Sequence, residues 1–218
     1  MRLLSRQVSA LGLGIVMAAA AVTVIPTSPA SAALPTPLVD YNTMESFDGT
    51  RSVSLDSQLT SVASLDQGTI VSRFRTSSSN VAKALISASN SGLDSSNLTM
   101  SVNTDKIHVE ARTAQTNYFT NLDWPIAYDR AGRLNDNQWH TAVTSVGPQG
   151  TKIYIDGYQV HAGTSRSFFN DIPNLNSLKI GANVDSAGTE WKFVGDIART
   201  QIYGSVLTDM EIRDLYPA

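Results

Sequence analysis

The segment Lys152-Ile153-Tyr154-Ile155-Asp156-Gly157 decides the fold class of this chain. Its first four residues alternate as a strand that buries one face, and Asp156-Gly157 tolerates the positive φ angles of a two-residue hairpin turn. Tyr158 to His161 should return antiparallel, and Trp139 to Val146 precedes the hairpin as another strand. The sequence therefore predicts an antiparallel sheet in this region.

The same period of two continues on both sides of the hairpin. Further strands are expected at Thr69–Arg75, Leu98–Val102, Lys106–Arg112, Leu178–Gly181 and Phe193–Tyr203. Thr208 and Glu211 form a capping-box pattern that opens a short terminal helix, and a second short helix is expected within Asp56–Leu65. Many short strands separated by turn residues predict an all-β antiparallel β-sandwich or jelly roll with one or two short helices.

The first 32 residues have the pattern of a secretory signal peptide. Arg2 and Arg6 precede an apolar run from Leu11 to Ile25, and a small-residue cleavage site ends at Ala32. The run of about 15 residues is shorter than the roughly 20 that a spanning helix needs. We expect cleavage after Ala32 and secretion, with a short N-terminal membrane anchor as the alternative. Residues 33–42 are expected to be a linker and residues 43–218 one folded domain, at roughly 100 to 200 residues per domain.

The composition excludes several classes of protein. The chain has no Cys, which removes disulfides, thiolate metal sites and cysteine nucleophiles. Its 16 basic and 19 acidic side chains give a net charge of −3, so nucleic acid is not an expected partner. No cofactor is predicted, although Asp and carbonyl oxygens at a jelly-roll rim would suffice for a structural calcium ion. We expect a monomer without a membrane span.

The strand Lys106–Arg112 carries the candidate site. Alternation sends Ile107, Val109 and Ala111 to one face, and the opposite face receives Lys106, His108, Glu110 and Arg112. One interpretation is a solvated face with a weak Glu110–Arg112 ion pair. The other is a platform for an anion or a sugar, because Arg binds a carboxylate in bidentate fashion and Glu accepts hydroxyl hydrogens.

Several segments share their order with one known family. Gly68–Arg75 is similar to its opening strand, Leu85–Ser91 to the Ser-Asn loop that follows, Lys106–Arg112 to its Glu-x-Arg strand, and Thr151–Gly157 to its hairpin. Leu178–Gly181 and Trp191–Ile197 continue the order. The chain thus resembles the N-terminal lectin-like domain of bacterial sialidases, carbohydrate-binding module family 40. That family belongs to the concanavalin A-like and laminin G-like jelly rolls.

The resemblance implies a secreted carbohydrate-binding module whose first candidate ligand is a glycan ending in sialic acid or a similar acidic sugar. Arg112 matches the family's first arginine, Glu110 matches its acidic partner, and Trp191 matches its aromatic contact. For Trp191 an inward core position is the alternative. Tyr118 and Asn90 would flank the site. The family's second arginine has no counterpart in the loop Ala182–Ser186, which holds Asp185 instead.

No enzyme activity is predicted. A sialidase needs a six-bladed propeller for which the chain has no room, and glycoside hydrolysis needs a second carboxylate beside Glu110 that the strand lacks. Two alternative functions remain. One is a laminin G-like adhesion or structural module that binds a protein or a cell-wall polymer, and the other is a sialidase-related chain without its catalytic propeller.

Overall fold

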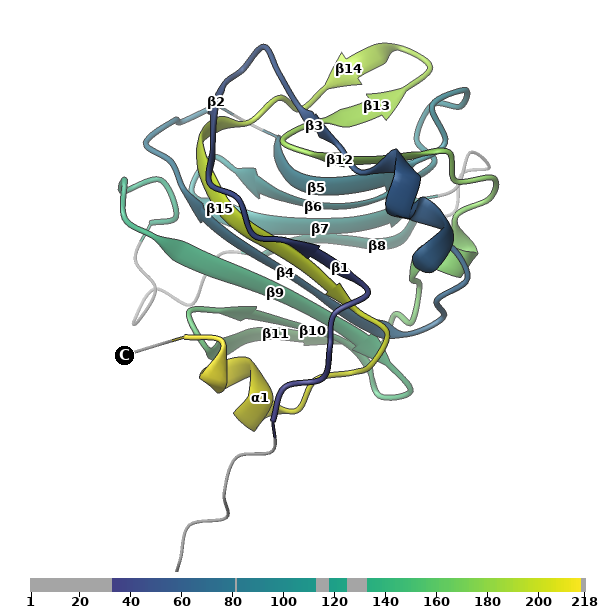
Figure 1. Cartoon of the computed structure of the whole chain (residues 1–218), viewed down its shortest axis with the longest axis vertical. Helices are drawn as coiled ribbons and strands as arrows, with labels where there is room; N and C mark the ends of the chain where they lie inside the picture. Colours follow the sequence, from purple (N-terminus) through teal and green to yellow (C-terminus); the bar gives the residue numbers. More distant parts are fainter. Residues whose placement is uncertain (1–32, 81, 113–117, 125–132, 217–218) are drawn as a thin grey trace, which may run out of the picture. The chain divides into compact units, whose positions relative to one another are not determined.

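The computed structural model describes residues 33–80, 82–112, 118–124 and 133–216, and for 118–124 it describes the backbone alone. These residues form two antiparallel sheets that pack face to face (Figure 1). One sheet has the order β1 (Val39–Tyr41), β15 (Val194–Tyr203), β4 (Gly68–Arg75), β9 (His140–Gly147), β10 (Gly150–Ile155) and β11 (Tyr158–Gly163), with β2 (Glu45–Asp48) also on β15. The other has the order β3 (Val53–Ser54), β12 (Ser177–Ile180), β5 (Lys83–Ser89), β6 (Asn97–Asn103), β7 (Lys106–Arg112) and β8 (Tyr118–Trp124).

Three shorter features complete the fold. A separate hairpin is formed by β13 (Asn183–Asp185) and β14 (Gly188–Glu190). Two 3-10 turns, η1 (Asp56–Ser61) and η2 (Phe169–Asp171), and one helix, α1 (Asp209–Asp214), are the helical elements of the described residues. The predicted all-β antiparallel sandwich is confirmed.

The core lies between the inner faces of the two sheets. Alternation puts Ile70 and Phe74 of the seven-stranded sheet, and Met100 and Val109 of the six-stranded sheet, into one buried cluster. The hairpin prediction also holds, since β10 pairs with β11 and Asp156 and Gly157 both have positive φ. At about 0.8 kcal/mol per buried methylene, this cluster is the main source of the stability of the sandwich.

The prediction for Leu85–Ser91 is wrong, because most of this segment is the strand β5 and the loop starts at Asn90. All seven residues of β5 are buried. Leu85, Ile86 and Ala88 enter the core, whereas Ser87 and Ser89 lie on the outer face beneath the β13–β14 hairpin, to which both donate hydrogen bonds. A strand covered on both faces lacks the polar alternation of an exposed strand, and its serines gave it the composition of a loop.

The domain boundary and one helix also differ from expectation. Val39 is fully buried in β1, and the backbone N–H of Leu38 donates to the Ile202 carbonyl at 2.8 Å. The folded region therefore begins inside the expected linker 33–42, and not at residue 43. The short helix expected within Asp56–Leu65 is present over Asp56–Ser61 and differs only in being of the 3-10 type, η1.

Helix α1 begins where the capping box predicts it. The Thr208 hydroxyl accepts from the Glu211 backbone N–H at 3.2 Å, and the Glu211 carboxylate accepts from the Thr208 backbone N–H at 2.7 Å. The helix packs on the outer face of the seven-stranded sheet and covers a second cluster that includes Val71, Val143 and Tyr203. In the region of the chain that the structure describes, no helix has the length and apolar character needed to span a membrane.

Candidate functional site

The outer face of the six-stranded sheet carries the polar residues of β7. Ile107, Val109 and Ala111 enter the core, as alternation predicts. His108 and Glu110 point to the outer face, yet they are only 7% and 4% exposed. The interpretation of a solvated face is therefore wrong at these two positions, and a buried carboxylate requires an explanation from its neighbours.

Glu110 has three polar neighbours. The Asn97 amide donates to Glu110 Oε1 at 2.9 Å, and His108 Nε2 lies 3.3 Å from Oε2. Arg112 Nη1 lies 3.5 Å from Oε1. The Arg112 side chain is 23% exposed and that of Glu110 is 5% exposed, so Glu110 forms the buried base and Arg112 the accessible edge of one cluster.

The environment keeps Glu110 ionised. Burial acts to raise the pKa of this carboxyl group, but hydrogen bonds from His108 and Asn97 and the positive charge of Arg112 together hold the pKa below its ordinary value. A fixed negative charge holds the guanidinium in one orientation. Such preorganisation lowers the entropy cost of binding an anion at the exposed edge of Arg112.

A chain of hydrogen bonds links Glu110 to the β13–β14 hairpin. The Asn97 amide also donates to Thr99 Oγ1 at 2.8 Å, and the Thr99 and Ser87 hydroxyls are 2.7 Å apart. Ser87 then donates to Asn183 Oδ1 at 2.7 Å. The hairpin is thereby tied to the outer face of β5 and, through Ser87, Thr99 and Asn97, to Glu110.

Trp191 follows the hairpin and lies on the same outer face. Its ring meets the His108 ring edge to face, with centroids 6.0 Å apart, and its carbonyl accepts from the Ala84 N–H at 2.7 Å. Trp191 is half-buried, whereas Phe193 fills the core. Of the two positions considered for Trp191, the structure has the outer one, at the end of a row formed with His108, Glu110 and Arg112.

The loop that lacks the second arginine is strand β13. The Asp185 carboxylate accepts from the Asn183 side-chain amide at 3.3 Å and from the Ala187 backbone N–H at 2.9 Å. Asp185 is 8% exposed. Its charge is thus bound within its own hairpin turn, which reduces the repulsion of an anionic ligand that its sequence position would suggest.

Asn90 and Tyr118 are the other two predicted residues. The Asn90 amide is bonded on both sides, since its oxygen accepts from the Gly92 N–H at 3.0 Å and its nitrogen donates to the Pro173 carbonyl at 3.3 Å. Asn90 therefore stabilises the loop after β5. The Tyr118 backbone pairs with Arg112 in the β7–β8 register, but its side chain lies outside the described region of the chain.

Sequence reasoning missed the polar residues that support Glu110. Asn97 and Thr99 alternate with the core residues Leu98 and Met100 along β6, so the period of two could have placed them beside Glu110. No comparable signal marks Asn183, because its contact with Ser87 joins residues 96 positions apart.

The arrangement suits the binding of a polar ligand. A guanidinium for an anionic group, an indole edge and a row of amides and hydroxyls suit the polar and apolar faces of a sugar. Glu110 is bonded to three neighbours, and among the described residues no group of three or more His, Cys, Asp and Glu side chains is placed to hold a metal ion.

Solved structures of sialidase modules share this fold. The CBM40 domain of the Ruminococcus gnavus IT-sialidase bound to α2,3-sialyllactose superposes with a TM-score of 0.72 at 20% identity, covering 83% of this chain and 99% of that domain. Its complex with α2,6-sialyllactose gives 0.72 at 22% identity with the same coverage. The leech intramolecular trans-sialidase in complex with 2,7-anhydro-Neu5Ac gives 0.70 at 21% identity, covering 83% of this chain and 28% of that enzyme.

At these identities the structural likeness establishes the fold. No curated protein matches the chain significantly. The family model for the N-terminal domain of sialidases matches residues 39–215, which span both sheets and every residue of the Glu110 cluster. The chain therefore belongs to the sialidase N-terminal domain family.

Proposed function

We propose that this protein is a secreted, non-catalytic carbohydrate-binding module whose ligand is a glycan ending in sialic acid or a similar acidic sugar. The observation that carries the proposal is Arg112, held at an exposed edge by the buried, ionised Glu110. The R. gnavus module with the same fold is bound to sialyllactose, and family membership makes the same class of ligand the first candidate here.

In this proposal each residue of the row has a distinct role. Arg112 binds the carboxylate of the sugar, and Glu110 orients Arg112. Trp191, half-buried beside His108, packs against an apolar face of the ring. A single arginine and one aromatic residue on an open face give weak binding, because the cost of immobilising the ligand offsets much of the contact energy.

A glycan array tests the proposal directly. The purified protein is compared with Arg112→Ala and with Arg166→Ala, an exposed arginine in the segment between β11 and η2 that serves as the charge-matched control. Sialylated, other acidic and neutral glycans are presented side by side. We expect binding to acidic glycans that Arg166→Ala retains and Arg112→Ala weakens about ten- to a hundredfold, the loss of one charge-assisted contact of roughly 1.5–3 kcal/mol.

Four results would contradict elements of the proposal. Equal binding of the wild type and Arg112→Ala would remove the assigned site, and binding to no glycan would favour an adhesion module for a protein or cell-wall partner. Release of free sialic acid from a fluorogenic sialoside by the purified protein would refute the non-catalytic role. A mature product in the medium that does not begin at Ala33 would refute cleavage after Ala32.

A further inference from the structure

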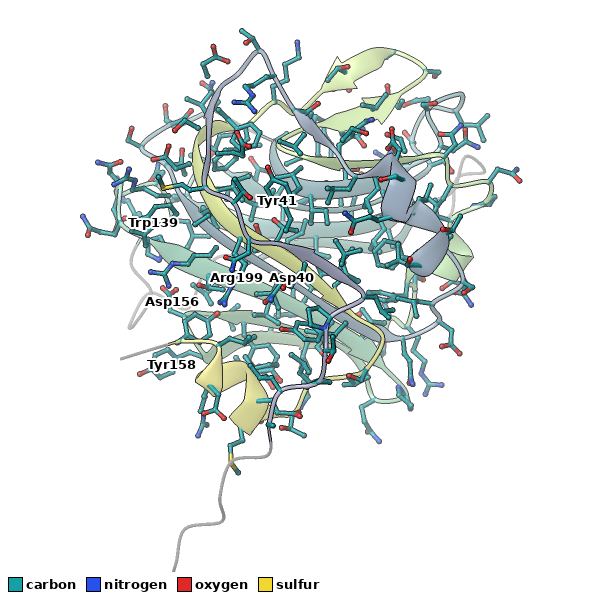
Figure 2. The ribbon with its side chains drawn as sticks, viewed as in Figure 1. Asp40, Tyr41, Trp139, Asp156, Tyr158 and Arg199 are labelled. Carbon is teal, nitrogen blue, oxygen red and sulfur yellow. The ribbon has the colours of Figure 1, made fainter. Side chains whose placement is uncertain are left out.

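A second cluster of positive charge lies on the outer face of the seven-stranded sheet. Arg199 of β15 pairs in register with Arg73 of β4. Figure 2 labels Arg199 and, farther along this sheet, Trp139. Directly opposed residues of an antiparallel pair have Cβ atoms about 4.5–5.5 Å apart, and like charges in such a pair are destabilising.

The two arginines lack the close carboxylate partner that Arg75 has. Among the described residues neither forms an ion pair, whereas Arg75, on the same face, pairs with Asp196 at 2.6 Å. Arg199 Nη2 donates to the Leu215 carbonyl at the end of α1 at 3.2 Å, and Arg199 Nε has no partner among the described residues but is itself buried and out of a ligand's reach. The pair therefore keeps hydrogen-bond donors that the described region of the protein does not use.

Trp139 orders this surface. Its ring centroid lies 5.7 Å from the guanidinium carbon of Arg73 and 5.0 Å from that of Arg75. Cation–π contacts of this kind fix the guanidinium planes without occupying their hydrogen-bond donors. The Trp139 ring thus holds Arg73 in place, and no described residue uses its hydrogen-bond donors. Bidentate recognition of a planar oxyanion needs this arrangement.

We propose that Arg73 and Arg199 form a second binding site, for the carboxylate of an acidic glycan. The oxyanion chemistry follows from the unneutralised arginine pair, whereas the assignment to a glycan rests on the proposed function. The site is on the outer face of the seven-stranded sheet, and the Glu110–Arg112 cluster is on that of the six-stranded sheet. One sugar cannot fill both sites, so a single module would hold two glycan ends.

Backbone NMR titrations of the purified protein distinguish the two sites. The probes are 3′-sialyllactose, a disaccharide ending in glucuronic acid, neutral lactose and sodium acetate. With the acidic sugars we expect shifts at residues 73, 141 and 199 in addition to shifts along β7. The first group should weaken about ten- to a hundredfold in Arg73→Gln, weaken less in Arg73→Lys, and persist in Arg112→Ala and in the control Arg166→Gln.

Unchanged shifts at residues 73 and 199 in Arg73→Gln would overturn the second site. Loss of both groups of shifts in Arg112→Ala would also overturn it, because the second group would then be transmitted from the first site. Acetate that binds as tightly as the acidic sugars would overturn the assignment to a glycan. If Arg112→Ala loses only the shifts along β7, both sites are supported. If the wild type shows shifts only at residues 73, 141 and 199, the proposed function of Arg112 is refuted and the second site is not.

Unfolding in urea at low salt provides a readout that a structural role would not give. Arg73 has no hydrogen bond among the described residues, and its replacement by Gln relieves repulsion from Arg199. We expect the unfolding midpoint of Arg73→Gln to equal or exceed that of the wild type. A lower midpoint would show that Arg73 serves the fold and would overturn the proposal.

Discussion

Replacing Glu110 by Gln tests whether one buried charge supports both the fold and the site. Glu110 Oε1 accepts from Asn97 at 2.9 Å and faces Arg112 at 3.5 Å, while Oε2 lies 3.3 Å from His108. A Gln side chain has nearly the same shape but offers one oxygen and one NH2 group. It can satisfy Asn97 or His108 as an acceptor, but not both, and it removes the charge that faces Arg112.

The expected cost can be worked out from these contacts. A hydrogen bond to a charged group contributes roughly 1.5–3 kcal/mol. One such bond is lost on the His108 side, and the Arg112 contact adds less because its 23% exposure allows solvent to screen it. We expect Glu110→Gln to lower the free energy of unfolding by about 2–3 kcal/mol at pH 7, which for a domain of this size lowers the melting temperature by roughly 4–12 °C.

Urea unfolding at several pH values measures this effect, with Glu190→Gln on the exposed strand β14 as the control. Because the pKa of Glu110 is below its ordinary value of 4.5, its stabilising effect is complete above about pH 4.5 and is lost as the pH falls through the pKa of the folded state. The gap between wild type and Glu110→Gln should therefore close in acid. A difference in free energy of unfolding below about 0.5 kcal/mol at pH 7 would refute the predicted role of Glu110, since ordinary surface substitutions have effects of that size. A difference that persists in acid would refute it too.

Three other predictions concern stability. Burial lowers the pKa of Lys83 to about 8, although the charge of Asp105 acts to raise it. The unfolded chain keeps this proton up to its ordinary pKa, so the free energy of unfolding of the wild type should rise between about pH 8 and 10.5. We expect a rise of about 3 kcal/mol relative to Lys83→Met, measured by urea titrations. His140 lies between Asp156 at 2.7 Å and Asp136 at 3.1 Å. Burial acts to lower the pKa of His140, but these carboxylates raise it overall. The wild type should therefore be more stable than His140→Gln by the full amount below pH 6.5, and this difference should disappear as the pH rises through the raised pKa. Thr208→Ala removes the N-cap of α1 and should cost about 1 kcal/mol, measured as a lower melting temperature.

The fold was largely predictable because the sandwich buries alternate residues of most of its strands. That signal fails where both faces of a strand are covered. β5 is buried along its whole length, since the core lies on one side and the β13–β14 hairpin lies on the other. Its serines donate to partners in that hairpin, a contact that the resemblance of Leu85–Ser91 to a family loop did not predict.

The candidate site was predictable in its residue types but not in its burial. Alternation correctly sent Glu110 and Arg112 of β7 to the outer face. Whether that face is exposed to solvent depends on distant segments that cover it, such as Trp191, whose ring meets that of His108 and which follows the β13–β14 hairpin. The cover turns an ordinary surface ion pair into a buried carboxylate with an accessible arginine, and no local pattern encodes that change.

The arginine pair shows the same limit more sharply, because its existence depends on one irregular residue. Ile197 faces the core opposite Phe74, and strict alternation would also send Arg199 toward the core. The register of β15 against β4 shifts between Ile197 and Arg199, so Ala198 is the extra residue of a bulge and every later residue is moved to the other face. Arg199 thereby meets Arg73 on the outer face, while Thr200 turns inward, where its hydroxyl lies 3.4 Å from that of Ser72. Without this bulge, and with Ala198 kept in regular alternation, Arg199 would face the core, so the bulge is what creates the second cluster of charge.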